Sequence, residues 1–219
     1  MFSAVERAGD KAMRWNNQVL KKKLFPSALF KTTDENIHLT FDDGPHPLAT
    51  PIVLQELKKH NIQATFFLLG QNAQKFPDLV RQIHREGHQI ANHSFTHANL
   101  FFKTKTFIRD EILHTQEVID SIIGTHSYYF RPPYGYLNWT IMDVLQEIGL
   151  TCVLWDVDSK DYRLNSVTDI STRVIPNTKN GSILLFHDNE LTLERGQTYL
   201  PVIFNILLKR EFVFKTLPL

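Results

Sequence analysis

The chain has 219 residues, a formal net charge of +1 and a single cysteine. This length allows one domain with a substantial core. Hydrophobic residues make up 42% and charged residues 21%, which excludes a disordered or fibrous chain. The near-neutral charge excludes a bulk basic field that would recruit nucleic acid, and one cysteine excludes an intrachain disulfide.

The first 30 residues carry no apolar run long enough for a transmembrane segment, because Pro26 interrupts the best candidate, Leu24–Phe30. No signal peptide is visible, so we expect a cytoplasmic location, or an extracytoplasmic one if the chain is exported otherwise or has lost a leader. The three lysines at 21–23 are expected on a solvated face rather than against acidic lipid.

Short apolar runs then alternate with stretches of helical periodicity. Predicted strands cover residues 37–41, 64–69, 88–92, 128–130, 151–155, 182–186 and 212–216. Predicted helices lie near residues 52–57, 73–86, 106–123, 138–148, 166–175 and 199–209. This alternation indicates parallel pairing. Without a glycine-rich dinucleotide motif, it favours an α/β barrel of about seven strands over an open doubly wound sheet, with residues 1–35 as an extension packed outside.

Unusual polar residues fall where the predicted strands end. They are Asp42 and Asp43 after the first strand, His93 after the third, Arg131 after the fourth, Asp158 after the fifth and His187 after the sixth. The C-terminal strand ends of a barrel lie on one rim and carry the active site. We therefore expect these residues to converge.

Two pairs suggest a metal site. Adjacent residues at a strand end point in different directions, so one of Asp42 and Asp43 can bind metal while the other handles protons. His93 and His97 are spaced so that both imidazoles can reach one ion, although the glutamate of the zinc-protease pattern is absent. Taken singly, the carboxylates also fit a solvated turn, and the histidine pair alone is weak evidence.

Two further segments suggest proton transfer and charge stabilisation. In Arg131–Gly135 two prolines stiffen the backbone, so Tyr134 could aim its N–H at a developing oxyanion and Arg131 could pair with a carboxylate. His187 suits proton transfer, with Asp158 to orient it. A stiff loop with a surface arginine and a structural histidine are the alternatives.

In this order the segments resemble the NodB-like polysaccharide deacetylases, also called carbohydrate esterase family 4. Five motifs match, namely Thr40–Pro45, His93–His97, Arg131–Gly135, Asp158–Tyr162 and Leu185–His187. The resemblance covers residues 36–219, taken as the catalytic domain, and implies a distorted (β/α) barrel. Tyr162 stands where the family usually has tryptophan, which keeps an aromatic wall but could alter substrate preference.

The resemblance also implies roles for single residues. Asp43, His93 and His97 would bind a divalent metal, zinc first, with Co²⁺, Ni²⁺ or Mn²⁺ as alternatives. Asp42 would be the general base held by Arg131, and the N–H of Tyr134 would stabilise the oxyanion. His187, supported by Asp158, would be the general acid. Leu185 would line the acetyl pocket, with Pro133 and Tyr162 as further substrate contacts.

The implied activity is removal of acetyl groups from N-acetylated sugars of peptidoglycan, chitin or related oligosaccharides, with release of acetate. The partner would be an acetylated glycan. Three alternatives stay open: an O-acetyl esterase acting on acetylated xylan, a metallophosphoesterase, and a non-catalytic glycan-binding relative. The last predicts loss of a motif residue, and all are present.

Overall fold

A computed structural model describes residues 18–164 and 166–218. Seven strands form one curled sheet in the order β5-β4-β3-β2-β1-β7-β6, and every hydrogen-bonded pair of strands is parallel. The strands are β1 His38–Asp42, β2 Thr65–Leu68, β3 Gln89–Asn92, β4 Tyr129–Phe130, β5 Thr151–Cys152, β6 Val157–Asp158 and β7 Ile183–His187. The predicted distorted α/β barrel is therefore confirmed.

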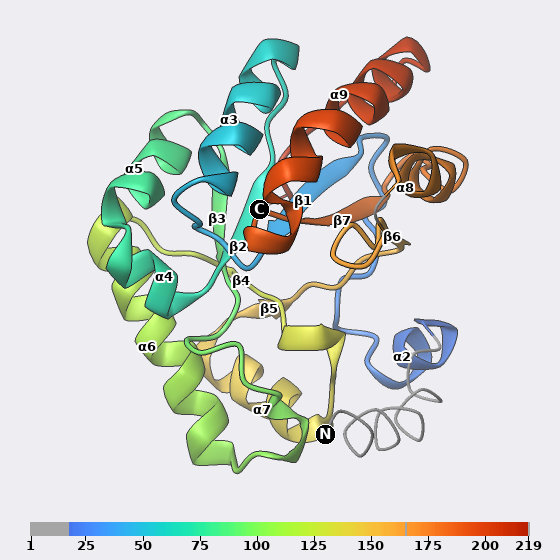
Figure 1. The fold of residues 1–219 in the computed structure, drawn as a ribbon. Helices are drawn as coiled ribbons and strands as arrows, with labels where there is room; N and C mark the ends of the chain where they lie inside the picture. Colours follow the sequence, from blue (N-terminus) through green and yellow to red (C-terminus); the bar gives the residue numbers. More distant parts are fainter. Residues whose placement is uncertain (1–17, 165, 219) are drawn as a thin grey trace, which may run out of the picture.

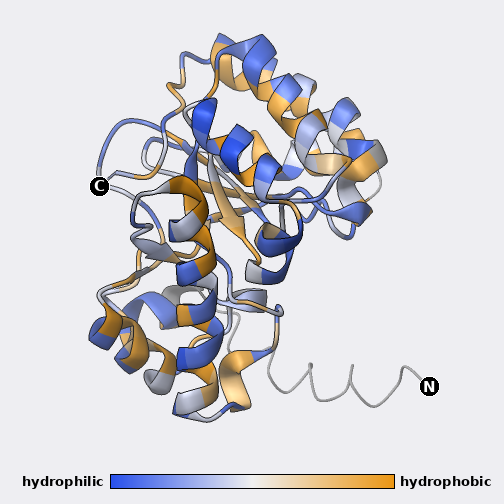
Figure 2. Ribbon diagram, turned by 90° about the vertical axis from the view of Figure 1, so that its left-hand side faces the viewer, coloured by the Kyte–Doolittle hydropathy of each residue, from blue (hydrophilic) through white to orange (hydrophobic). Residues whose placement is uncertain are grey.

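Helices surround the strands on the outside (Figure 1). They are α2 Gln18–Leu24, α3 Ala49–His60, α4 Gly70–Lys75, α5 Pro77–Arg85, α6 Lys105–Ile123, α7 Trp139–Ile148, α8 Val167–Val174 and α9 Leu193–Lys209, with short 3-10 helices η2 Leu100–Phe102, η3 Pro133–Gly135 and η4 Glu190–Thr192. Figure 2 shows hydrophobic strand segments in the interior and hydrophilic outer helix faces. Within the described residues, no helix is long and apolar enough to span a membrane.

Side chains of β1 alternate between two environments, as the period of a strand requires. Leu39 and Phe41 are buried in a cluster that also contains residues of α3 and α9. Thr40 and Asp42 point to the other face, where both contact Arg131. The strand pattern therefore puts Asp42 inside the barrel rim.

One predicted strand is absent, and another is shorter than predicted. Residues 212–216 do not form a strand, since Phe214 makes only an isolated bridge to Ile37. The reason is that β1 already pairs with β2 and β7, so neither edge of β1 is free. The sheet gains instead a strand that was not predicted, β6 at Val157–Asp158. The strand predicted at 151–155 is present only as the two-residue β5.

The helix predicted near 73–86 is two helices. Pro77 occupies the first turn of α5 and lacks a backbone N–H. The preceding residue, Phe76, leaves the helical region with φ −128° and ψ 57°, so α4 ends there. The last helix begins earlier than predicted, at Leu193.

The described part of the N-terminal extension packs on the barrel; residues 1–17 of that prediction lie outside the described residues. Phe25 and Phe30 are buried in the cluster that contains the inner face of α7. The chain then bridges two separate strands, because Leu29 pairs with Val153 beyond β5 and Lys31 pairs with Ser182 before β7. Residues 29–31 thus cross the side of the barrel where, in the described residues, β5 and β6 do not pair.

Gly181 offers a test of this crossing. Its φ is +78°, and a Cβ there would collide with the carbonyl oxygen of Thr32. Gly124 has a similar φ of +73°, but a Cβ there would meet nothing within 4 Å. Alanine at Gly124 therefore measures the cost of the backbone strain without a steric clash. We expect Gly124→Ala to lower the free energy of unfolding by about 1 kcal/mol and Gly181→Ala by about 3 kcal/mol, measured by urea denaturation. Equal losses would contradict the packing of this crossing.

Candidate active site

Asp42 and His187 are direct neighbours at one rim of the barrel. They end β1 and β7, and the two residues are register partners in the parallel pair. His93 follows β3 directly, and Arg131 follows β4. The predicted convergence at the C-terminal strand ends thus puts these residues together, and the contacts below show how each is held.

Asp43, His93 and His97 form a cluster that fits a metal ion. One ligand atom from each residue lies within 4.8 Å of the others. Oδ1 of Asp43 lies 3.5 Å from Nε2 of His93 and 3.3 Å from Nε2 of His97. This oxygen is buried and has no hydrogen-bond partner among the described residues. A buried carboxylate oxygen facing two imidazole nitrogens is a donor set suited to a divalent cation such as zinc.

The tautomer of His93 also suits metal binding. Its Nδ1 lies 2.7 Å from the carbonyl oxygen of Arg131, and because a carbonyl only accepts, Nδ1 carries the proton. The lone pair is therefore on Nε2, which faces Asp43. Burial and the neighbouring His93 lower the pKa of His97, which favours its unprotonated, metal-binding form.

The backbone of the cluster is strained. Asp43, Ser94 and His97 all have left-handed φ, at 79°, 69° and 61°. Buried Glu111 on α6 anchors the loop between the histidines, since its carboxylate accepts the backbone N–H of Phe95 and Thr96 and the hydroxyl of Thr96. Glu111 lies outside the five motifs, and its position on α6 does not single it out, because Thr115 and Gln116 are further polar residues on the same buried face.

Asn189 binds the other carboxylate oxygen of Asp43, and the sequence did not predict this contact. Its Nδ2 donates to Oδ2 of Asp43 at 2.7 Å, and Nδ2 of Asn72 donates to the carbonyl oxygen of Asp43 at 2.9 Å. Asn189 follows the motif Leu185–His187 by two residues, and that proximity was the available signal. Because Asn189 binds Oδ2, the carboxylate oxygen of Asp43 without a hydrogen-bond partner among the described residues is Oδ1.

Arg131 holds Asp42 as predicted. Its side chain is fully buried, and Nη1 donates to Oδ1 of Asp42 at 2.6 Å and to Oγ1 of Thr40 at 2.8 Å. Oδ2 of Asp42 lies 3.7 Å from Nε2 of His93. Asp42 therefore presents one oxygen toward the metal cluster while Arg131 fixes the other.

The prediction that Asp158 supports His187 is wrong. Nδ1 of His187 donates to Oδ1 of Asp161 at 2.7 Å, whereas the carboxylate of Asp158 accepts the backbone N–H of Lys160. Asp161 also accepts the backbone N–H of His187 and the hydroxyl of Tyr199. The chain turns after β6, so the residue three positions beyond the strand end, not the strand end itself, faces the histidine.

His187 is held in its protonated form. Burial alone would lower its pKa, but the charge and hydrogen bond of Asp161, aided by Asp43 and Asp42, raise the pKa of His187 to about 9. At neutral pH the imidazole thus carries a proton to donate.

Two exposed aromatic rings flank the site. Tyr134 lies edge-on to His97 at a centroid distance of 4.7 Å, and Tyr162 lies edge-on to His187 at 5.1 Å. Pro133, which directly precedes Tyr134 in η3, and Leu185, two residues before His187 in β7, are both buried. The rings of Tyr134 and Tyr162 thus lie against His97 and His187, respectively.

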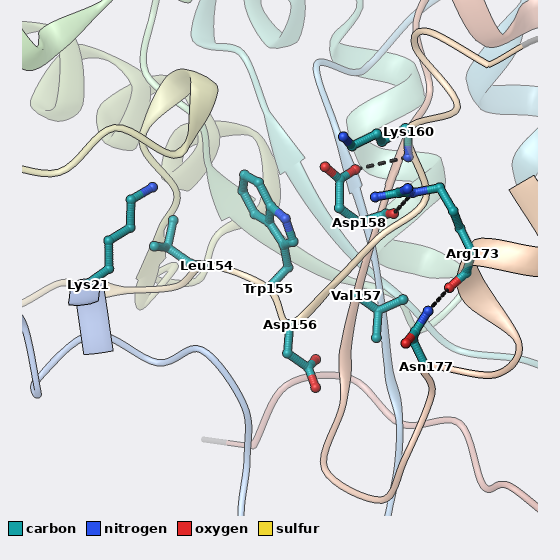
Figure 3. Close-up of a pocket in the computed structure, with 9 residues that line it drawn as sticks. All are labelled: Lys21, Leu154, Trp155, Asp156, Val157, Asp158, Lys160, Arg173 and Asn177. Atoms are coloured by element: carbon teal, nitrogen blue, oxygen red, sulfur yellow. Dashed lines mark hydrogen bonds between the residues drawn. The ribbon is translucent and has the colours of Figure 1, made fainter. Parts of the chain in front are cut away.

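A separate cavity of about 500 Å³ lies between α2 and α8, and Asp43, His93 and His97 are not among its lining residues. Figure 3 shows Lys21 from α2 on one side, Arg173 from α8 on the other, and residues 154–158 between them. Its lining includes Asp158, which ends β6, and Trp155, which packs on Gly135 of η3.

A family model described as polysaccharide deacetylase matches residues 30–153. The chain belongs to this family. Over 69% of its length it is 40% identical to a peptidoglycan-N-acetylglucosamine deacetylase of Bacillus cereus, and the match spans 55% of that protein. It is 36% identical to a chitooligosaccharide deacetylase of Azorhizobium caulinodans over 74% of this chain and 78% of the relative.

A solved structure supports the family fold. The crystal structure of a peptidoglycan N-acetylglucosamine deacetylase superimposes with a TM-score of 0.83 and 36% identity, covering 87% of this chain and 90% of that one. The resemblance stated for the five motifs is thus confirmed at the level of family and fold. The roles of individual residues rest on the geometry above.

Asn189 gives a test of the metal cluster. Asn189→Ala removes the donor to Oδ2 of Asp43, so we expect the affinity for zinc to fall about 10- to 100-fold, measured by competition with a chromophoric chelator. Asn205→Ala is the matched control, because Asn205 donates to Pro201 on the exposed side of α9. Unchanged zinc affinity in Asn189→Ala would show that this contact does not orient the ligand.

Proposed function

We propose that the chain is a metal-dependent hydrolase that removes acetyl groups from N-acetylglucosamine units of peptidoglycan, chitin or related oligosaccharides. The observation that carries the proposal is the arrangement around Asp43. The buried Oδ1 of Asp43, which has no hydrogen-bond partner among the described residues, faces two imidazoles. On the same rim lie Asp42, which is bound by Arg131, and His187, which is bound by Asp161. The names of the relatives support the substrate class.

Asp43, His93 and His97 would hold the cation, for which we propose zinc. The ion would supply Lewis-acid chemistry, polarising the acetyl carbonyl and lowering the pKa of water. Asp42 would take the proton from the attacking water, and Arg131 would keep its carboxylate in place. The N–H of Tyr134 would donate to the carbonyl oxygen as negative charge develops there.

His187 completes the reaction on the leaving-group side. As the bond from water oxygen to carbonyl carbon forms and the carbon–nitrogen bond breaks, Nε2 of His187 would give its proton to the departing nitrogen. Asp161 keeps the imidazole oriented and charged. The products are acetate and a free amine. Leu185 would contact the acetyl methyl group, and the rings of Tyr134 and Tyr162 would pack on sugar faces.

The direct test is acetate release. We expect the wild-type chain to release acetate from N-acetylated chitooligosaccharides or peptidoglycan, to lose this activity with a chelator, and to regain it with zinc. Asp42→Asn is expected to retain zinc but lose about 10²- to 10⁴-fold in kcat, because the general base is gone. His93→Ala is expected to lose both zinc and activity.

Metal content by mass spectrometry and thermal unfolding of each variant separate loss of chemistry from loss of fold. Full activity in Asp42→Asn would show that another group is the base. Release of phosphate from a generic phosphate ester, without acetate release, would favour a phosphoesterase.

The Asp161–His187 pair makes a second prediction, on leaving groups. Asp161→Asn is expected to lower hydrolysis of the N-acetyl amide about 100-fold, since the amine must be protonated to leave. Hydrolysis of 4-nitrophenyl acetate should fall far less, because its leaving group departs without a proton. The control is Asp158→Asn, which should leave the amide-to-ester rate ratio unchanged. A lower amide-to-ester rate ratio in Asp158→Asn, with an unchanged ratio in Asp161→Asn, would show that Asp158 is the functional partner of His187.

A further inference from the structure

Lys21 does not lie on a solvated face, contrary to the sequence prediction. Its side chain is only 7% exposed, whereas Lys22 and Lys23 are exposed. Figure 3 shows the side chain of Lys21 extending from α2 past Leu154. A lysine is rarely buried unless its ammonium has a partner.

The partner of Lys21 belongs to the active-site turn. Nζ donates to the carbonyl oxygen of Gly135 at 2.8 Å, across 114 residues of sequence. Gly135 ends the turn η3, which carries the N–H of Tyr134. Hydrogen bonds from an ammonium are stronger than those between neutral groups. The N-terminal segment therefore holds a turn from the middle of the sequence.

The turn needs outside support, because its backbone is strained. Tyr134 and Gly135 are consecutive left-handed residues, with φ of 61° and 64°. On one side Trp155 packs so closely on Gly135 that a Cβ there would lie 2.7 Å from the indole. Lys21 binds the carbonyl at the end of the same turn. Both contacts hold a conformation that tyrosine does not favour by itself.

The segment that directly follows α2 is anchored on the barrel. The ring of Phe25 packs on that of Trp139 at 4.8 Å, and Leu29 donates to the carbonyl oxygen of Cys152 and accepts from the N–H of Leu154. These contacts fix Lys21 relative to the barrel. The family model begins at residue 30, so α2 lies outside the matched region.

We propose that Lys21 is a positioning residue for deacetylation: by binding the carbonyl of Gly135 it fixes the turn that aims the Tyr134 N–H at the acetyl oxygen. The proposal rests on the proposed function. Helix α2 is then a part of the active site that the five motifs do not include. Burial lowers the pKa of Lys21, which agrees with an ammonium removed from bulk water.

The kinetic test compares Lys21→Met with the neighbouring control Lys23→Met. A misplaced oxyanion donor weakens the transition state and not the bound substrate. For an N-acetylated chitooligosaccharide we therefore expect kcat of Lys21→Met to fall about 10- to 100-fold, with KM and zinc affinity unchanged. Lys21→Arg, which keeps a charged donor, should lose less. Wild-type kcat in Lys21→Met, or an equal loss in Lys23→Met, would overturn the proposal.

A second measurement does not depend on activity. Amide hydrogen exchange at residues 134–136 should accelerate at least about tenfold in Lys21→Met, while exchange in α6 stays as in the wild type. Unchanged exchange in the turn would overturn the positioning role whatever the kinetics. If the wild type released no acetate, the proposed function would fail, and the exchange result would still decide whether Lys21 orders the turn.

Discussion

The buried ion pair of Arg131 and Asp42 is the interaction on which the rest of the site depends. The guanidinium lies 4.0 Å from the ring centroid of Phe67 in the barrel interior and donates to Asp42, to Thr40 and to the carbonyl oxygens of Val153 and Leu154. Those two carbonyls follow β5, on the side of the barrel where it does not pair with β6. Arg131 thus satisfies backbone groups that a closed sheet would pair, and loss of its partner would leave a buried charge, which typically costs about 3–5 kcal/mol.

Arg131 also contacts both Asp42 and His93. Its side chain orients the carboxylate of Asp42, while its carbonyl oxygen sets the tautomer of His93. The proposed metal ligand His93 and the proposed base Asp42 therefore share one support, the residue that follows β4. Movement of this strand end would disturb both at once, which explains why so much buried hydrogen bonding converges on one arginine.

The sequence predicts the residues at strand ends well, and those beyond them poorly. Strand periodicity fixes where Asp42, His93 and His187 fall, so their meeting follows from parallel topology. Asp161, Asn189 and Glu111 reach the site through loops or from a helix, and their directions depend on tertiary contacts without a sequence period. Lys21 shows the limit most clearly, since its acceptor is a backbone carbonyl that any residue at position 135 would present.

The adjacent carboxylates show how one local sequence yields two functions. Asp42 is the last residue of β1, so its side chain follows the strand alternation into the barrel, where Arg131 binds it. Asp43 leaves the strand with a left-handed φ, and a buried neighbour, Asp188, packs against Gly44 so closely that a Cβ there would clash. Because Asn189 occupies one oxygen of Asp43, the other is directed at His93 and His97. The different roles that we propose for Asp42 and Asp43 therefore follow from which partner each carboxylate contacts, since the two residues are chemically identical.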